Sequence, residues 1–393
     1  MASFSLTGLL SAPIYGRFTD LTGSTKAAVI FSNIFEIGGN FMYFVASSPY
    51  MVLGSRLIAG IGSGSGSSIL GMISRNTTKE RRTAVFSQLM SLRQLGLLIG
   101  PAFNLFLRKL DFYLFGFHVN LYSAPGIFMA ALWIIHELMV ILFYRELQFT
   151  GPDDEVVQPI NNQGSSELSW KEIFKDLLRE EVVVCLAVTF TVMFVQTGVE
   201  TLLTPLTLQL FGWKELPNSI FFCIAGFVII VSFLFLSKIS KWVADRQMLL
   251  GGFIVVTVMY AYFLIFIIFA VKAEKGSTWV LVMFCIYCVI VIFGLPFVWV
   301  PQASLYSKIT SEQSQAFNQG VRLLVMGLGQ ILGPLWAASW FHDLPVMASV
   351  NLALVSLILL MIIASYRVLT VAKSPETDEP TERTRLLSHS INA

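Results

Sequence analysis

Six ionisable side chains lie inside long apolar stretches of the sequence, where charge is unusual. Three are acidic and three are basic: Glu36, Arg56, Arg93, Glu137, Glu200 and Arg322. A charged side chain in hydrocarbon is energetically expensive, so such residues are usually paired or functional. The equal numbers of the two signs predict pairing. We therefore take these six residues as candidates for substrate binding or ion coupling.

The elements that must position these residues are predicted to be membrane-spanning helices. The chain has 393 residues, is 55% hydrophobic and 13% charged, and has a mean hydropathy of +0.72. A soluble domain carries about 25% charged residues. Apolar runs of roughly 20 residues can cross a bilayer as helices. They fall at 26–46, 50–73, 84–107, 122–144, 181–206, 217–237, 248–271, 277–300, 316–340 and 346–368, with a shorter run at 2–16. The prediction is an all-α polytopic membrane protein with eleven spans.

The distribution of lysine and arginine predicts the orientation. These residues concentrate in alternate loops, beginning with the loop 17–26, and such loops face the cytosol. The C-terminus is then cytosolic and the N-terminus faces the lumen or the exterior. The predicted organisation is an N-terminal helical half (1–144), a cytosolic central loop (145–180), a C-terminal helical half (181–369) and a disordered tail (370–393). The end of the central loop reads as an interfacial amphipathic helix or, alternatively, as a solvated linker helix.

The stretch "RLIAGIGSGSGSSILG" (56–71) combines one arginine with many small residues. It lies inside an apolar span, which argues against a flexible linker, and it follows no strand, which argues against a phosphate loop. Small residues four positions apart let membrane helices approach closely. The predicted packing residues here are Gly60, Gly62, Gly64 and Gly66.

Several motifs of this chain resemble the major facilitator superfamily. Arg56-x-x-x-Gly60-x-Gly62 is similar to its fourth-helix motif, and "GRFTDLTGSTK" is similar to its gating loop between helices two and three. In that loop Gly16, Asp20 and Gly23 match, while Leu21 replaces the usual basic residue. "LGLLIGP" resembles the fifth-helix motif and recurs as "LGQILGP" in the position of helix eleven. The matching residues of these two copies are Gly100, Pro101, Gly333 and Pro334.

The resemblance implies the major facilitator fold, in which two parallel halves of six helices are related by pseudo-symmetry. The chain begins inside helix two of that pattern, so about eleven of twelve helices are present. A truncated product is favoured over a protein that works without its first helix. "ETLLTPLTLQLFGW", "LYSKI" and "VNLYSAP" resemble the lysosomal, ceroid-lipofuscinosis branch. That branch implies a secondary transporter or ion pathway of the endolysosomal membrane, with chloride among the proposed permeants.

The family pattern also implies how the charges are paired. Helices four and seven line the cavity in this family, so Arg56 and Glu200 are expected to face each other. Because a carboxylate in a poorly hydrated site favours its protonated form, Glu200 is a candidate coupling residue and Arg56 its partner or an anion anchor. A permanent salt bridge is the alternative.

The other intramembrane charges are interpreted from their own helices and nearest loops. Arg93 and Glu137 are expected to form a local pair. Glu36 is expected to be a hydrogen-bond partner in helix packing. Arg322 either extends to the lipid headgroups or closes a cytosolic gate with Asp20 or Glu312.

The sequence favours transport over catalysis. It contains no nucleophile–base set, metal-ligand cluster, nucleotide motif or basic tract, so we expect no enzyme activity, cofactor, metal or nucleic acid. The leading hypothesis is a proton-linked secondary transporter of small solutes or ions in the endolysosomal membrane. The alternatives are a chloride or anion channel-like protein and a transport-inactive scaffold or trafficking protein.

A sorting signal is predicted in the tail. Glu382, Leu386 and Leu387 match an acidic dileucine signal that a clathrin adaptor would read on the cytosolic side. This signal agrees with a lysosomal or endosomal location.

Overall fold

The computed structural model of the chain describes residues 2–107, 110–114, 117–120, 122–146 and 170–370. Apart from a short hairpin, its regular structure is helical, which confirms the predicted all-α class. The N-terminal elements are α1 (Ala2–Thr22), α2 (Thr25–Phe44), α3 (Pro49–Ser63), α4 (Gly66–Arg75), α5 (Lys79–Leu107), β1 (Phe112–Leu114), β2 (Phe117–Val119) and α6 (Ala124–Phe143). The later elements are α7 (Trp170–Leu177), α8 (Glu180–Phe211), α9 (Glu215–Ile239), α10 (Asp245–Ala270), α11 (Thr278–Gly294), α12 (Pro296–Ile309), α13 (Gln315–Ser339), the 3₁₀ turn η1 (Phe341–Asp343) and α14 (Leu344–Ala364).

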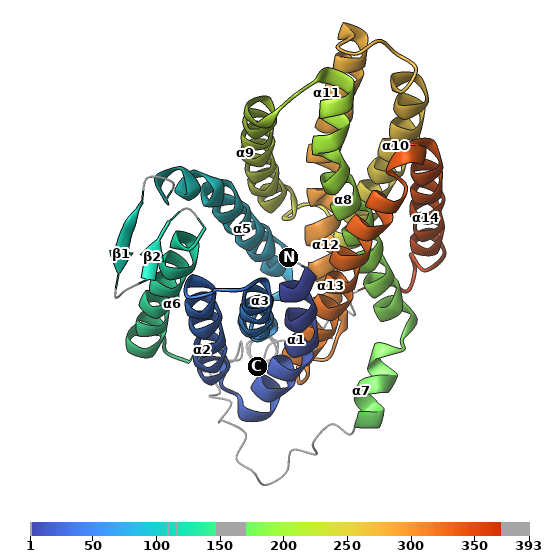
Figure 1. Cartoon of the computed structure of the whole chain (residues 1–393). Coiled ribbons are helices and arrows are strands. Elements are labelled where there is room, and N and C mark those ends of the chain that lie inside the picture. The colour runs from blue at the N-terminus through green and yellow to red at the C-terminus, as the bar shows by residue number, and fades with distance from the viewer. Residues whose placement is uncertain (1, 108–109, 115–116, 121, 147–169, 371–393) are drawn as a thin grey trace, which may run out of the picture.

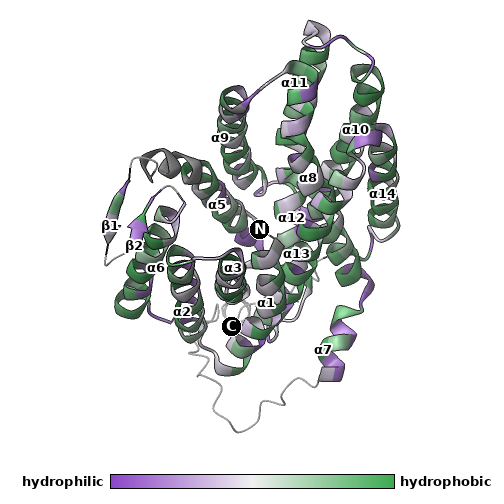
Figure 2. Cartoon of the chain, viewed as in Figure 1, coloured by the Kyte–Doolittle hydropathy of each residue, from purple (hydrophilic) through white to green (hydrophobic). Residues whose placement is uncertain are grey.

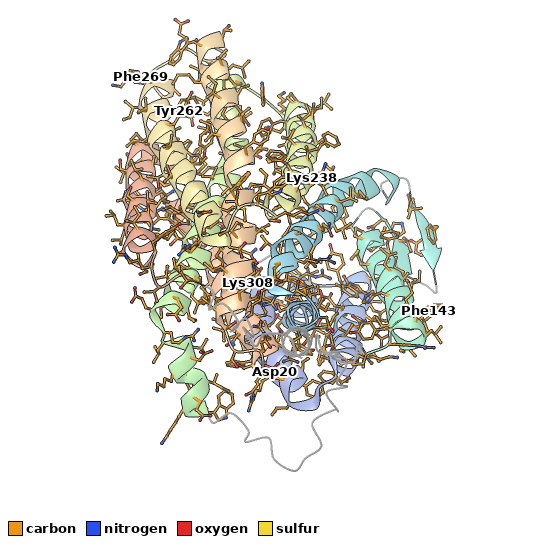
Figure 3. The ribbon with its side chains drawn as sticks, turned by 180° about the vertical axis from the view of Figure 1, so that it is seen from behind. Asp20, Phe143, Lys238, Tyr262, Phe269 and Lys308 are labelled. Carbon is orange, nitrogen blue, oxygen red and sulfur yellow. The ribbon has the colours of Figure 1, made fainter. Side chains whose placement is uncertain are left out.

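The membrane character of these helices is visible in their hydropathy, as Figure 2 shows. Within the described residues, eight helical segments are long and apolar enough to cross a bilayer. The remaining predicted spans correspond to α1, α2 and α5, which are helical but do not meet that criterion. Large apolar side chains cover outer surfaces; Phe143 at the end of α6, labelled in Figure 3, is 76% exposed. Lipid rather than water suits such surfaces.

Local sequence signals explain where several helices begin and end. Ser24 caps α2 by accepting the N–H of Ala27 at 3.2 Å, and Ser48 caps α3 by accepting the N–H of Met51 at 3.2 Å. Gly212 ends α8 with φ = 70°, a left-handed conformation that glycine adopts without a steric penalty.

Two of the spans are interrupted near their middle. The span Pro49–Arg75 is divided into α3 and α4 at Gly64 and Ser65, and the span Thr278–Ile309 is divided into α11 and α12 at Leu295. Pro296 follows the second break and lacks the backbone N–H that would continue the ladder.

We call the helices before and after the central loop the two halves; α1, α4 and α5 of the first meet α9, α12 and α13 of the second. Figure 1 shows α2, α3 and α6 gathered on one side and α9, α10, α11 and α14 on the other. Across the interface, α1 packs against α13 and α5 packs against α9. The extended apolar core of the C-terminal half is built from α8, α10, α11, α12 and α14. The candidate site lies where these helices face α5.

Candidate functional site

A cavity of about 550 Å³ lies between the two halves. Its walls come from α5 on the N-terminal side and from α8, α9, α10, α11, α12 and α13 on the C-terminal side. This volume falls in the range of small-molecule sites, roughly 300–1,000 Å³. Most of its lining is apolar, and Arg93 and Glu200 are its charged residues. The described structure therefore places one cation and one anion in a cavity large enough for a solute.

Glu200 and Arg93 reach this cavity from opposite halves. Glu200 lies one turn after Gln196 on α8, and the Gln196 amide donates to Glu200 Oε1 at 2.7 Å. Arg93 lies on α5, with its guanidinium 5.9 Å from the centre of the Trp299 ring. The charges of Glu200 and Arg93 attract each other across the cavity. A solute or a proton that entered here would change the balance between them.

The predicted pairing of Arg56 with Glu200 is wrong. Arg56 on α3 donates through Nη2 to Asn40 Oδ1 at 3.2 Å, and its guanidinium lies 4.5 Å from the Tyr43 ring centre. Glu36, which is 5% exposed, supplies the nearby negative charge. The cluster lies where α2 packs against α3. The contacts of Arg56 therefore come from α2 within the same half, while its Nε has no hydrogen-bond partner among the described residues.

The predicted pairing of Arg93 with Glu137 is also wrong. Glu137 Oε2 accepts from Asn33 Nδ2 at 2.6 Å, and His136 Nδ1 lies 3.1 Å from the same amide nitrogen. These contacts join α6 to α2, two helices of the same half. Glu137 therefore has a structural partner on α2, while Arg93 is directed to the cavity.

Arg322 lies in a second cavity of about 310 Å³. It is 4% exposed, and its Nε donates to Gln319 Oε1 at 2.9 Å. Arg93 lines this cavity as well as the larger one. The predicted gate of Arg322 with Asp20 or Glu312 is not formed, and neither is an extension to the headgroups, because the side chain is buried inside the bundle.

The gating-motif residues meet the N-terminus of α13. The Asp20 carboxylate pairs with Arg75 and accepts the N–H groups of Ala316 at 3.1 Å and Phe317 at 2.8 Å. Asp20 is labelled in Figure 3. A carboxylate is stabilised by free N–H groups and by the positive end of the helix dipole. Asp20 thus ties α1 to the other half, through the backbone of α13 rather than through Arg322.

Gly16 and Gly23 support that contact in different ways. A Cβ on Gly16 would collide with the backbone of Ala316, so glycine permits the close approach of α1 and α13. Gly23 has φ = 68° and allows the sharp turn from α1 into α2.

A second polar cluster at the same end of the molecule was not predicted from the sequence. Asp245, at the start of α10, accepts from Thr83 Oγ1 at 2.7 Å and Ser304 Oγ at 2.9 Å. Lys308 donates to Asp245 Oδ2 at 2.7 Å and to Thr83 at 3.1 Å. We call the end of the bundle that carries Asp20, Asp245 and Lys308 the closed end. The sequence feature that could have revealed this cluster is the segment "LSKISKWVADRQ", which occupies the place of a second gating loop but matches that pattern poorly.

The predicted packing glycines serve different neighbours. Added Cβ atoms on Gly60 and Gly64 would collide with α1, one on Gly62 with α2, and one on Gly333 with α8. Gly66 differs, since its nearest neighbour is a Leu323 methyl at 3.7 Å, and it lines the smaller cavity.

The remaining predicted positions are less informative. Pro334 lies within α13. Gly100 and Pro101 fall in α5, but their surroundings lie outside the described residues. The sorting-signal residues Glu382, Leu386 and Leu387 also lie outside them.

Solved transporters share this architecture. The chain superposes on the human organic anion transporter MFSD10 (TETRAN) with a TM-score of 0.71 and 17% identity, covering 92% of this chain and 82% of that one. It matches the transporter FucP, solved in the outward conformation, with a TM-score of 0.68 and 11% identity, covering 94% and 88%. At these identities the similarity concerns the fold.

Sequence comparison gives the family. The chain is 25% identical over 272 residues to major facilitator superfamily domain-containing protein 8 of Xenopus laevis, covering 65% of this chain and 52% of that protein. This is the branch that the motifs indicated. An uncharacterized MFS-type transporter of Schizosaccharomyces pombe is 24% identical over 234 residues, covering 57% and 45%. The chain thus spans about half the length of the curated relatives it matches. Because the sequence pattern of the Major Facilitator Superfamily matches residues 1–334, the chain is a multi-pass membrane protein that belongs to this superfamily.

Proposed function

We propose that this protein is a secondary transporter that moves small solutes by alternating access, with Glu200 as the proton-coupling carboxylate and Arg93 as its partner. One observation carries the proposal: the two opposite charges come from opposite halves and line one cavity of about 550 Å³. Protonation of Glu200 would cancel its attraction for Arg93. The tie between the halves would weaken, and Arg93 would become free to hold a solute.

The closed end supports an alternating mechanism. Hydrogen bonds between the halves gather there and join α5 to α10 and α12, α5 to α9, and α1 to α13. Each of these bonds has a side-chain partner, so the halves can separate without unfolding a helix. We assign the closed end to the cytosolic side, because the loops there carry the excess of lysine and arginine. In this assignment the cavity faces the lumen.

We place the protein in lysosomal or endosomal membranes, with its C-terminus in the cytosol. The acidic dileucine pattern of the tail and the similarity to the domain-containing protein 8 branch support this location. A proton gradient across such a membrane would supply the driving force for Glu200.

The experiment that tests the function compares pH-dependent flux in enlarged lysosomes that express the chain or its Glu200→Gln variant. Glu137→Gln is the matched control, because Glu137 is an intramembrane carboxylate held by Asn33 outside the cavity. We expect flux driven by luminal acidity to be lost in Glu200→Gln and retained in Glu137→Gln. Flux that ignores both the pH gradient and Glu200→Gln would overturn the coupling role.

An anion channel-like protein is the second candidate, because Arg93 joins two cavities and Arg322 lies in the smaller one. Rings or rows of arginine favour anion permeation. Voltage-driven chloride current without saturation would favour this candidate over a transporter. A correctly localised chain with neither flux nor current would instead support a scaffold.

A further inference from the structure

The smaller cavity has an unusual charge balance. Its described lining contains Arg93 and Arg322 and no carboxylate. The positive charge of Arg93 reaches Arg322, so the two cations repel each other. A buried cation without a counter-charge is energetically unfavourable, so buried cations in proteins are usually paired with an anion or a hydrogen-bonding partner. Arg93 is exposed, and Glu200 supplies a counter-charge for it. Arg322, in contrast, is buried, and no carboxylate lines the described wall of the smaller cavity.

Arg322 is the better placed of the two arginines. Its side chain is 4% exposed and lines the cavity, while its contact with Gln319 uses Nε and leaves the terminal nitrogens of the guanidinium for another partner. The candidate acids are engaged elsewhere or lie at the surface: Asp20 pairs with Arg75, and Glu312 is exposed. A guanidinium binds a carboxylate in a bidentate, planar arrangement.

The rest of the cavity wall sets the class of ligand. It consists mainly of aliphatic side chains from α4, α8 and α13, including Ile69, Val192 and Met326. Gln302 on α12 also lines the cavity, but its amide donates to Thr189 and to the carbonyl of Cys185 at 3.3 Å. Bare inorganic ions gain little from apolar walls, whereas a small organic acid buries its apolar body there. The volume of about 310 Å³ admits such a molecule.

We propose that Arg322 and Arg93 form a binding subsite for the carboxylate of a small organic anion, whose apolar body lies against α4, α8 and α13. This inference rests on the proposed transport function, for which it names the substrate class. Glu200 and the bound anion compete for Arg93. A proton on Glu200 therefore favours loading of the anion, and loss of that proton favours release.

The test measures binding rather than transport, so its failure is distinguishable from a failure of proton coupling. The probe is phenylacetate, added to the purified full chain in detergent and followed by isothermal titration and by intrinsic tryptophan fluorescence. Its neutral analogue 2-phenylethanol and sodium chloride are the comparison ligands. We expect phenylacetate to bind, 2-phenylethanol to bind at least about tenfold more weakly, and chloride alone not to reproduce the signal.

Variants locate the subsite. Arg322→Gln should weaken phenylacetate binding by about tenfold or more, while Arg322→Lys should retain part of it. Glu200→Gln should bind phenylacetate as tightly as the parent or more tightly, because Arg93 loses its competitor. Arg81→Gln is the matched control, since Arg81 is an exposed arginine.

Three outcomes would overturn the proposal. Equal affinity for the acid and the alcohol would show that the carboxylate charge does not contribute to binding. Chloride binding that excludes phenylacetate would reduce the site to an inorganic anion site. Unchanged affinity in folded Arg322→Gln or Arg322→Lys would place the anion elsewhere. If Arg322→Gln does not fold, Arg322→Lys still tests the location of the site, and the comparison of acid and alcohol on the parent protein still tests whether charge contributes to binding.

Discussion

Arg82 links the two halves at the scale of a single residue. It is 3% exposed and donates to the Ser307 carbonyl at 2.9 Å, the Thr77 carbonyl at 3.0 Å and the Ser74 carbonyl. These carbonyls lie near the C-terminal ends of α4 and α12, where helix dipoles favour a cation. One guanidinium thus satisfies acceptors from both halves at the closed end.

Removal of this guanidinium should destabilise the folded protein. Arg82→Gln removes a donor from the carbonyls of Ser74 and Thr77, at a cost of about 1–3 kcal/mol for each unsatisfied group, while the Ser307 carbonyl keeps the Gln315 amide as its donor. We expect a lower thermal unfolding temperature for purified Arg82→Gln in detergent. Arg81→Gln is the control, because Arg81 is exposed on the same turn. Equal unfolding temperatures for the two variants would contradict the role of Arg82.

The pairings of individual charges could not be predicted from the sequence. The residues themselves were identifiable, because charge inside apolar runs is rare. Arg56 was assigned to Glu200 from the helices that line a family cavity. The structure satisfies it instead with Asn40 and Tyr43 on α2, one helix earlier in the chain. Polar residues such as Asn33 and Asn40 carry no charge to mark them as partners, so the sequence offered no signal for these contacts.

At the scale of elements, the start of α13 is a point of contact between helices. The first N–H groups of a helix have no partner within it. Here the Asp20 carboxylate, held by Arg75, accepts two of them. Three elements, α1, α4 and α13, therefore depend on one charge.

Loss of that charge should loosen the first turn of α13. In Asp20→Asn we expect amide hydrogen exchange in residues 315–320 to rise by about tenfold, which corresponds to about 1.4 kcal/mol of lost local stability. Glu312→Gln is the control, because Glu312 is exposed and precedes the same helix. Unchanged exchange in Asp20→Asn would show that the charge of Asp20 does not stabilise the first turn of α13.

The elements themselves were largely predictable. The apolar runs of the sequence mark where the helices lie. For example, the span predicted at 181–206 corresponds to α8 at Glu180–Phe211. The interruption at Gly64 and the hairpin of β1 and β2 were not predicted. Small residues permit a break without requiring one, and strands of three residues each carry too little periodicity to be recognised.

At the scale of the whole molecule, the two halves are joined at the closed end while the charged cavities lie between them. Alternating access requires that this joint opens in each cycle. Thr83 on α5 and Ser304 on α12 lie on opposite sides of the joint, with their hydroxyl oxygens 2.7 Å apart. This separation suits a disulfide between cysteines at the two positions.

A cross-link there should stop transport without closing the cavity. We expect oxidised Thr83→Cys/Ser304→Cys protein, in a background with the exposed Cys223 and Cys285 replaced by serine, to retain phenylacetate binding and lose flux. Reduction should restore the flux, and each single cysteine variant, treated with the same oxidant, is the control. Because the bond fixes α5 to α12, flux at the parent rate in fully cross-linked protein would mean that the halves need not separate. The solute would then pass along a continuous pore, and the protein would be a channel and not a transporter.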